Sequence, residues 1–437
     1  MRDSCSGRAV LLLASGPVRF VHVVYWVTLL MVACGSQTPA TLWPDAGFDA
    51  GEIQNPKPLI DAGPARDTGP VVVTGNADKL DLLFIVDNSS SMREEQVALR
   101  REFPSMIRKL VSGDHDGNGK LDHQPVTDLH IGVVSSNMGA DQHVRGCEGL
   151  GDDGLLQHTG NLAHDSSLSC ASDYPSFLSY ASGAPSVAAL SNDFGCIAAL
   201  GTSGCGFEQH LESALKALWP ASQPELTFFD GTDLVATGHG DRENAGFLRH
   251  AVNAAATLAV VVIADEDDCS TADRAIFTPE AGPDAGNPYS AQPLNLRCFY
   301  NHDKAFPLER YLFGFAHLGS RRMVFAGIVG VPVDLVDANA RSKIDFENPT
   351  ARNAYYDKLL ADSRMQETLN PQSASPGNPP GELMEACNGT LGRAFPARRF
   401  VELAKNFGQD SLIQSICSGS FDSPVDQVVE RVSVPLE

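Results

Sequence analysis

The 437-residue sequence lacks the short motifs by which most common enzyme classes are recognised. It has no His-Glu-x-x-His, no Walker-type phosphate loop and no Gly-x-Ser-x-Gly pattern. It also has no Cys-x-x-Cys pair, which argues against the common zinc and redox sites. The histidines are scattered and do not fall at metal-ligand spacing. We therefore expect a protein that is not an enzyme.

Basic residues are also few. The chain has 32 Lys and Arg against 54 Asp and Glu, and its formal net charge is -22. Nucleic-acid binding is excluded on this ground because it requires a basic surface. The apolar content of 43% is nevertheless ample for a large core. The composition predicts an exported, globular, cation-binding protein.

Residues 1–33 predict an export signal. The apolar run 20–33 is too short for a comfortable membrane span, although a single-pass anchor is the alternative. The basic leader before it contains Arg2, Arg8 and Arg19. Met31-Val32-Ala33-Cys34 resembles a bacterial lipobox, which implies cleavage before Cys34 and lipidation of this cysteine. Because Gly35 follows rather than Asp, the resemblance favours the outer membrane of the cell envelope.

Residues 34–78 are rich in Pro, Gly, Ala and Asp, and the unit Asp-Ala-Gly recurs at 45–47, 49–51 and 61–63. A segment of this composition cannot bury a core. We expect a flexible acidic tether that holds a domain off the membrane. It resembles the tethers of surface lipoproteins of myxobacteria.

The stretch 81–91 combines a short apolar run with the polar sequence Asp87-Asn88-Ser89-Ser90-Ser91. The run predicts a parallel strand that is buried on both faces. In open α/β sheets ligands bind at the carboxyl ends of strands, where the polar sequence lies. A carboxylate and two hydroxyls are hard oxygen ligands, which suit a small cation such as Mg²⁺ or Mn²⁺. The alternative is that the serines only cap the next helix.

A second apolar run, 258–264, also ends in acidic residues, at 265–268. Two buried strands that each end in a carboxylate can share one cation. We expect Asp265 to be the metal ligand and the three acids after it to face solvent.

Apolar patterns predict alternating helices and strands over residues 79–437. This alternation indicates an α/β fold with a doubly wound, mostly parallel sheet flanked by helices. Insertions are expected at about 135–204, 269–300 and 371–390, and Pro104 is expected to bend or split the first helix. The predicted strands are 80–86, 128–134, 258–264, 323–331 and 412–416. The predicted helices are 92–111, 208–219, 308–318, 397–406 and 425–432.

These motifs resemble the von Willebrand factor type A (VWFA) domain and its metal-ion-dependent adhesion site, from residue 80 to the C-terminus. The resemblance implies that Mg²⁺ or Mn²⁺ binds an acidic group of a protein or glycan ligand. The residues at matching positions are Asp87, Ser89, Ser91 and Asp265. Thr202 lies in the region of the family's threonine ligand, and Glu208 is the alternative. The expected function is adhesion or interaction. The alternatives are a structural scaffold of an envelope complex and a metal-assisted hydrolase that uses Asp265 and Glu266.

A second cation site is indicated between the first helix and the next strand. Its oxygen ligands alternate along the chain around a glycine turn, as in an EF-hand loop, although Pro125 stands in place of the terminal glutamate. We expect Ca²⁺ as a structural clip here, and an Asx-rich turn is the alternative. The predicted ligands are Asp114, Asp116, Asn118, Lys120 and Asp122.

Cys5 falls in the export signal and Cys34 is the expected anchor, which leaves eight cysteines. In an exported protein an even set indicates disulfides, although eight cysteines allow 105 pairings. Short loops favour the pairs Cys147–Cys170, Cys196–Cys205, Cys269–Cys298 and Cys387–Cys417.

Overall fold

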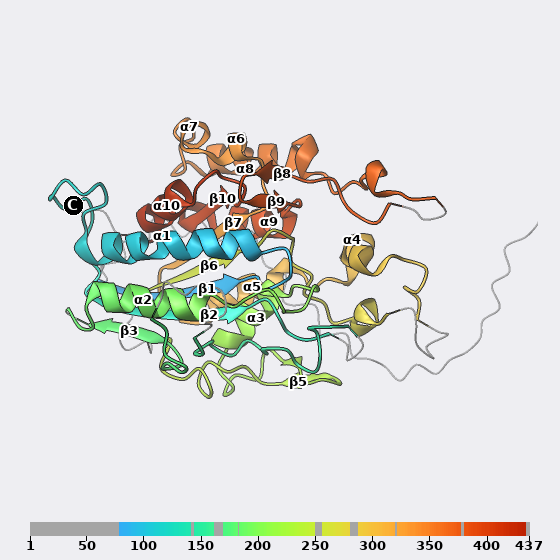
Figure 1. The fold of residues 1–437 in the computed structure, drawn as a ribbon, viewed down its shortest axis with the longest axis horizontal. Coiled ribbons are helices and arrows are strands. Elements are labelled where there is room, and N and C mark those ends of the chain that lie inside the picture. The colour runs from blue at the N-terminus through green and yellow to red at the C-terminus, as the bar shows by residue number, and fades with distance from the viewer. Residues whose placement is uncertain are drawn as a thin grey trace, which may run out of the picture. The chain divides into compact units, whose positions relative to one another are not determined.

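The computed structural model describes residues 78–140, 144–160, 169–181, 183–249, 256–279, 287–319, 321–376 and 380–433 (Figure 1). All of them belong to one unit that spans Pro70–Glu437. The expected export signal, Cys34 and the tether up to residue 77 lie outside the described residues. Of the helices that the structure describes, none is both long and apolar enough to cross a bilayer.

The centre of the fold is a six-stranded sheet with the order β10-β7-β6-β1-β2-β3. Neighbouring strands are parallel except at the edge, where β3 runs antiparallel to β2. Its strands are β1 (Lys79–Val86), β2 (Asp128–Ser135), β3 (Leu178–Ala181), β6 (Thr257–Ile263), β7 (Met323–Val329) and β10 (Ser411–Ser415). Two short hairpins consist of β4 (Phe228–Phe229) with β5 (Leu234–Ala236), and β8 (Cys387–Gly389) with β9 (Gly392–Ala394). The prediction of a mostly parallel sheet flanked by helices is confirmed.

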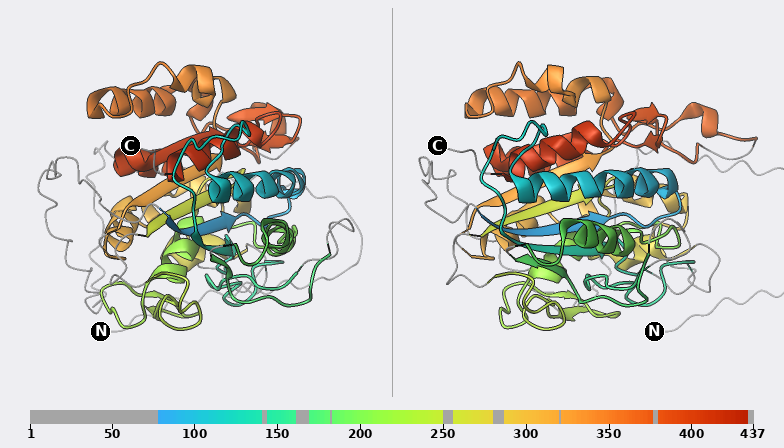
Figure 2. Two further views of the ribbon diagram at one scale, coloured as in Figure 1. Left: turned by 90° about the vertical axis from the view of Figure 1, so that its left-hand side faces the viewer. Right: turned by 60° about the vertical axis from the view of Figure 1, so that its left-hand side comes forward.

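Helices cover both faces of the sheet, as the three views show (Figures 1 and 2). Helices α1, α2 and α10 pack on one face, and α3, α5, α8 and α9 pack on the other. Burial on both faces explains why β1 and β6 read as continuous apolar runs. The helices are α1 (Arg93–Ser112), α2 (Val187–Ala198), α3 (His210–Leu218), α4 (Arg297–Tyr300), α5 (Leu308–Ala316), α6 (Val333–Val336), α7 (Ala338–Arg341), α8 (Pro349–Ala361), α9 (Arg398–Phe407) and α10 (Asp422–Val432).

Pro104 does not split α1, which is continuous over its 20 residues. Proline removes one backbone hydrogen bond from the helix interior. The helix nevertheless buries Leu99, Phe103 and Ile107 in the core on this face of the sheet. Its C-terminus is closed by Gly113, which has a left-handed conformation with φ 73°.

The segment 135–204 contains more regular structure than the sequence suggested. It includes the edge strand β3 and the helix α2. The Ser186 side chain caps α2 by accepting a hydrogen bond from the Ala189 N–H at 3.2 Å. Leu190, Phe194 and Ile197 then follow at helical spacing and are buried. The segments on either side of α2 are rich in Gly and Ser, and for this reason the helical spacing was not recognised in the sequence.

Four disulfides connect the loops, and two of the expected pairings are wrong. Cys147 bonds to Cys205, with Cα atoms 4.4 Å apart, and Cys170 bonds to Cys196, with Cα atoms 5.6 Å apart. The pairs Cys269–Cys298 and Cys387–Cys417 are confirmed. The assumption that the shortest loops are closed predicted the wrong pairs here. Helix α2 places Cys196 next to Cys170, and Cys147 pairs with Cys205 instead.

Three aromatic rings join α1 and α2 to the sheet. The ring centroids of Phe103 and Phe194 are 4.3 Å apart, and both rings contact Phe84 of β1. We predict that Phe194→Ala, which empties a fully buried position, lowers the free energy of unfolding by about 3–5 kcal/mol. Chemical denaturation measures this. The control Val235→Ala, at a side chain that is 61% exposed, changes it by less than about 0.5 kcal/mol. Equal effects of the two variants would contradict this packing.

Candidate metal centre

The polar ends of β1 and β6 meet at the centre of the sheet. The two strands are parallel neighbours, and their last residues, Val86 and Ile263, pair in register. Asp87 follows β1 directly, and its N–H donates to the Ile263 carbonyl oxygen at 3.0 Å. After β1 the chain crosses to α1 on one face, and after β6 it crosses to α5 on the other. This reversal is the switch point at which open α/β sheets bind ligands.

The loop after β1 folds around the Asp87 carboxyl group. Its Oδ1 accepts hydrogen bonds from the Ser89 N–H at 2.7 Å and from the Ser136 hydroxyl at 3.4 Å. Its Oδ2 is buried and has no hydrogen-bond donor among the described residues. The hydroxyls of Ser89 and Ser91 lie 3.1 Å apart. Because Ser91 is exposed, this loop leaves one side of the site open to solvent.

Asp265 lies directly across from this loop and is only 1% exposed. The Ser91 side chain interacts with its carboxyl group and partly offsets the rise in the pKa of that group. Its Oδ1 has no hydrogen-bond partner within the described part of the chain. The pKa of Asp265 is raised well above its usual range, first by burial and then by the charges of Asp87 and Glu266. The structure thus brings Asp87, Ser89, Ser91 and Asp265 together.

The expectation that the next acids face solvent is wrong for Asp268, which is buried, whereas Glu266 and Asp267 are half-buried. Asp268 is 4% exposed and accepts hydrogen bonds from the Leu211 N–H at 2.9 Å and from Arg399 Nε at 3.2 Å. Asp267 accepts a hydrogen bond from the Arg399 N–H at 3.0 Å. The N–H groups in the first turn of a helix lack partners within the helix. These two acids supply such partners to α3 and α9, and they thereby fix both helices against the site.

Glu208 interacts with the two aspartates through its charge, and no such interaction of Thr202 is found among the described residues. Its side chain is 3% exposed, and its pKa is raised well above the usual range by burial and by the charges of Glu266, Asp87 and Asp265. The Thr202 side chain makes no hydrogen bond to these acids in the described structure. Its loop is nevertheless near, since the Gly204 N–H donates to the Asn88 carbonyl oxygen at 2.8 Å.

Sequence reasoning missed Glu95 and His210 at this site, and it considered Glu266 only for the alternative hydrolase. Glu95, in the first turn of α1, is 2% exposed, and burial is the main cause that raises its pKa to about 7. Burial and the charge of Asp87 likewise raise the pKa of Glu266 to about 7. His210 is fully buried, with Nε2 3.6 Å from Asp87 Oδ2. Glu95 follows Ser91 by four residues, the spacing that places two residues on one helix face, so a signal for it was present.

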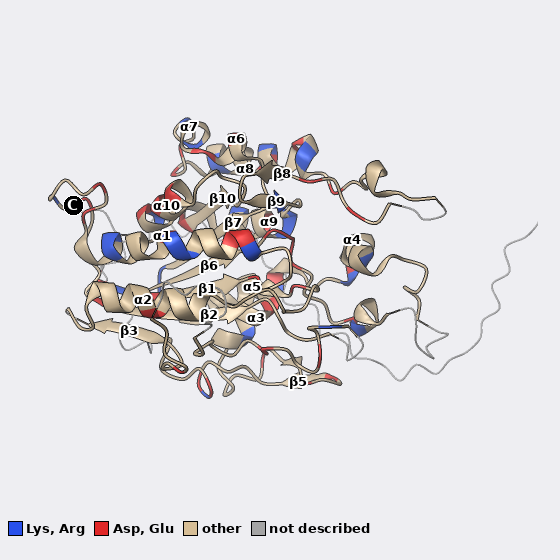
Figure 3. Ribbon diagram, viewed as in Figure 1, with Lys and Arg blue, Asp and Glu red and all other residues tan. Residues whose placement is uncertain are grey.

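The chemistry of this centre fits a divalent metal ion. Burying an ion costs several kcal/mol, and like charges held together add to this. Oxygens of Asp87, Glu95 and Asp265 are buried without hydrogen-bond partners in the described chain, which makes them available as ligands. The gathered carboxyl groups belong to Asp87, Glu95, Glu208, Asp265 and Glu266. Carboxylate and hydroxyl oxygens are the ligands that Mg²⁺ and Mn²⁺ prefer. Figure 3 shows acidic residues at the start of α1 and in nearby loops.

The predicted calcium loop lies at the other end of α1. Carboxylate oxygens of Asp114, Asp116 and Asp122 all lie within 4.8 Å of one another, and no other such group of three is found among the described residues. Asp114 accepts hydrogen bonds from the Gly117 and Gly119 N–H groups, both at 2.8 Å. The Asn118 side-chain oxygen accepts one from the Lys120 N–H at 2.8 Å. Acidic side chains and glycine turns thus form a closed loop with clustered oxygens.

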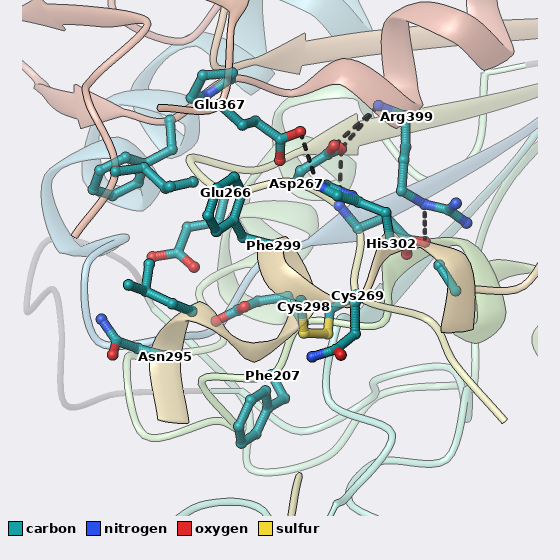
Figure 4. A pocket seen from close by; sticks show the side chains of 18 of the residues that line it. Phe207, Glu266, Asp267, Cys269, Asn295, Cys298, Phe299, His302, Glu367 and Arg399 are labelled. Carbon is teal, nitrogen blue, oxygen red and sulfur yellow. Dashed lines mark hydrogen bonds and ion pairs between the residues drawn. A yellow bond between two sulfur atoms is a disulfide. The ribbon is translucent and has the colours of Figure 1, made fainter. Parts of the chain in front are cut away.

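A cavity of about 180 Å³ adjoins the metal centre. Glu208 and Glu266 line it together with Asp267, and Figure 4 shows Asp267 and Glu367 near each other on one side. Burial and the charge of Asp267 raise the pKa of Glu367 to about 8. Its apolar lining includes Phe207, Ile276, Leu296, Phe299, Leu383 and Phe395.

These raised pKa values predict how the metal-free protein responds to pH. Glu95 and Glu367 bind protons in the folded state up to about pH 7 and pH 8, whereas the unfolded chain releases them near its ordinary pKa of 4.5. The contribution of these two groups to the free energy of unfolding is fully present below pH 4.5. It is lost as the pH rises through the pKa of each group in the folded state. We predict that the melting temperature of the metal-stripped protein falls between pH 5 and pH 8. Glu367→Gln should reduce this fall, and a rising melting temperature would contradict it.

Comparisons of the chain with family models, with curated proteins and with solved structures find no match.

Proposed function

We propose that this protein is a binding protein whose VWFA-like domain captures an acidic group of a protein or glycan partner through a bound Mg²⁺ or Mn²⁺. Asp87, Ser89, Ser91 and Asp265 bind the cation, directly or through water, and Glu208 takes the place of the threonine ligand. The partner's acidic group then completes the coordination shell from the open side at Ser91. The protein acts by binding and carries out no reaction.

The observation that carries the proposal is the meeting of Asp87 and Asp265 at the switch point. They follow adjacent parallel strands, and each has a buried oxygen with no hydrogen-bond partner in the described chain. Two such oxygens cannot be satisfied by each other, because neither carries a donor when ionised. A cation between them satisfies both. The exposed Ser91 gives an external ligand access to that cation.

We also propose that Cys34 carries a lipid that anchors the protein to the outer membrane, with residues 34–78 as the tether. The sequence pattern before Cys34 supports this. Acyl chains bury methylene groups in the bilayer, and several chains together hold firmly. The binding domain would then act at the cell envelope, where disulfides persist.

Binding of the proposed cation can be measured directly. Calorimetric titration of Mg²⁺ or Mn²⁺ into the metal-stripped full-length protein should give saturable binding, and a concentration of 100 times Kd should stabilise the fold by about 2.7 kcal/mol. Asp87→Asn should abolish both effects because it removes a charged ligand. The metal-free variant should melt no lower than the metal-free parent, since the substitution relieves repulsion with Asp265.

A matched control lies at the other end of β1. Asp81 is as buried as Asp87 but pairs with Arg249. Asp81→Asn should lower the melting temperature and leave Mg²⁺ binding unchanged. Loss of Mg²⁺ binding in both variants, or in neither, would refute the assignment of Asp87.

Capture of an acidic group is measured with the Mn²⁺-loaded protein. Mn²⁺-bound water relaxes bulk water protons, so a carboxylate that displaces this water lowers the relaxation rate. N-acetyl-aspartate amide should lower it and N-acetyl-asparagine amide should not. If the metal binds and stabilises the protein but both probes are without effect, the metal centre belongs to a structural scaffold instead.

The 114–122 loop should bind Ca²⁺ independently. It lies at the opposite end of the 20-residue α1, which at 1.5 Å per residue is about 30 Å long. Asp116→Ala should weaken Ca²⁺ binding in a calorimetric titration, because it removes one carboxylate of the cluster, and should leave Mg²⁺ binding at Asp87 intact. Unchanged Ca²⁺ binding in this variant would show that the loop is only an Asx-rich turn.

A further inference from the structure

We propose that the pocket beside the metal centre receives an arginine or lysine side chain of the same protein partner whose acidic group binds the cation. This inference rests on the proposed function and extends it from a single acidic group to a ligand that carries both charges. It also favours a protein over a glycan as the partner.

The lining of the pocket has an excess of acidic groups. Its carboxylates are those of Glu208, Glu266, Asp267, Asp268, Glu367 and Glu382. The arginines that line it are already engaged. Arg399 pairs with Asp268 at 3.2 Å, and Arg393 pairs with Glu382 at 3.4 Å. A basic side chain that enters the pocket therefore does not meet an unpaired arginine of the described chain.

Two of these carboxylates have no ion-pair partner. Within the described chain, no Lys, Arg or His nitrogen comes within 4.0 Å of the carboxylate of Glu208 or Glu266. Glu208 is 3% exposed and still borders the cavity. One divalent cation at the metal centre neutralises two of the negative charges gathered there. Glu266, which is not among the proposed cation ligands, lines the pocket and is left to pair with a guest.

The size and walls of the pocket suit one long basic side chain. At about 180 Å³ it is smaller than the pockets of about 300–1,000 Å³ that hold whole small molecules. Phe299 projects into it near Glu266 (Figure 4). An aliphatic stem packs on apolar walls while its charged end reaches carboxylates. The face of an aromatic ring also attracts ammonium and guanidinium groups.

The test uses the Mg²⁺-saturated full-length protein and two probes, N-acetyl-arginine amide and N-acetyl-lysine amide. The neutral control is the citrulline analogue, which has nearly the same shape as the arginine probe. We expect both cationic probes to bind, and the citrulline analogue to bind at least about tenfold more weakly because it cannot form a charge-assisted pair. Equal binding of the arginine and citrulline probes would overturn the proposal.

Variants locate the bound probe. Above its pKa of about 8 the Glu367 side chain is ionised, and under these conditions Glu367→Gln should weaken binding of the arginine probe by about tenfold through loss of one charge-assisted contact and leave Mg²⁺ binding unchanged. Glu385→Gln is the control, because Glu385 is likewise an ion-paired glutamate, with Arg393 as its partner, but does not line the pocket. It should change neither measurement. An unaffected Glu367→Gln variant, or displacement of the probe by Mg²⁺, would overturn the proposal.

Peptides of the form Asp-(Gly)n-Arg, with n from 0 to 4, test whether one partner supplies both groups. One member should bind more tightly than its citrulline counterpart in Mg²⁺, and the advantage should shrink in chelator, since linked groups raise each other's effective concentration. If Mg²⁺ itself fails to bind, the proposed function fails. If Mg²⁺ binds and no peptide gains from its arginine, only this inference fails.

Discussion

Repulsion among buried carboxylates is the constraint on which this molecule depends. Asp87 and Asp265 lie at the tips of two strands that the parallel register holds side by side. Glu208 is added from the loop before α3 and Glu95 from α1, and the charge of Asp87 raises the pKa of Glu208, Asp265 and Glu95. Such a group is stable only if protons or a cation compensate it. In the proposed cation-bound state, the metal would replace the protons that compensate this group.

The loops around the centre are fixed by strong restraints, as this repulsion requires. Gln96 of α1 donates to the carbonyl oxygens of both Asp87 and Gly201, at 2.8 and 2.9 Å, and so joins two loops. The Cys147–Cys205 disulfide holds the segment that leads to Glu208. On the other side, the hairpin β8–β9 is tied down by Cys387–Cys417. A Cβ atom at Gly392 of this hairpin would lie 1.8 Å from a Glu95 oxygen, so the hairpin passes directly over that acid.

The sequence was sufficient to predict the frame of the fold and only part of its centre. The strands before Asp87 and Asp265 were recognisable because burial on both faces leaves a continuous apolar run. Glu95 looked like an ordinary acid in the first turn of a helix, and only the β8–β9 hairpin, distant in sequence, makes it part of the centre. Glu266 and Asp267 looked like members of a solvated acidic run. Their burial depends on where α9 packs, which no local pattern reveals. Two of the predicted disulfide pairings were wrong for the same reason. The number of residues between two cysteines does not show where a helix such as α2 places a cysteine in the fold.

The charge of the whole chain bears on how a partner would approach the centre. With a formal net charge of -22, the chain attracts cations and basic groups over distances comparable to the screening length, and it repels an acidic group over the same range. A metal ion turns the repulsion of the acidic group into attraction only at short range, where the acidic group is close enough to coordinate the metal. A ligand with a basic group beside its acid escapes this conflict. The basic group draws the ligand in, and the metal then selects the acid. Under the proposed function, the net negative charge of the chain and the bound metal would thus favour the same kind of partner by different means.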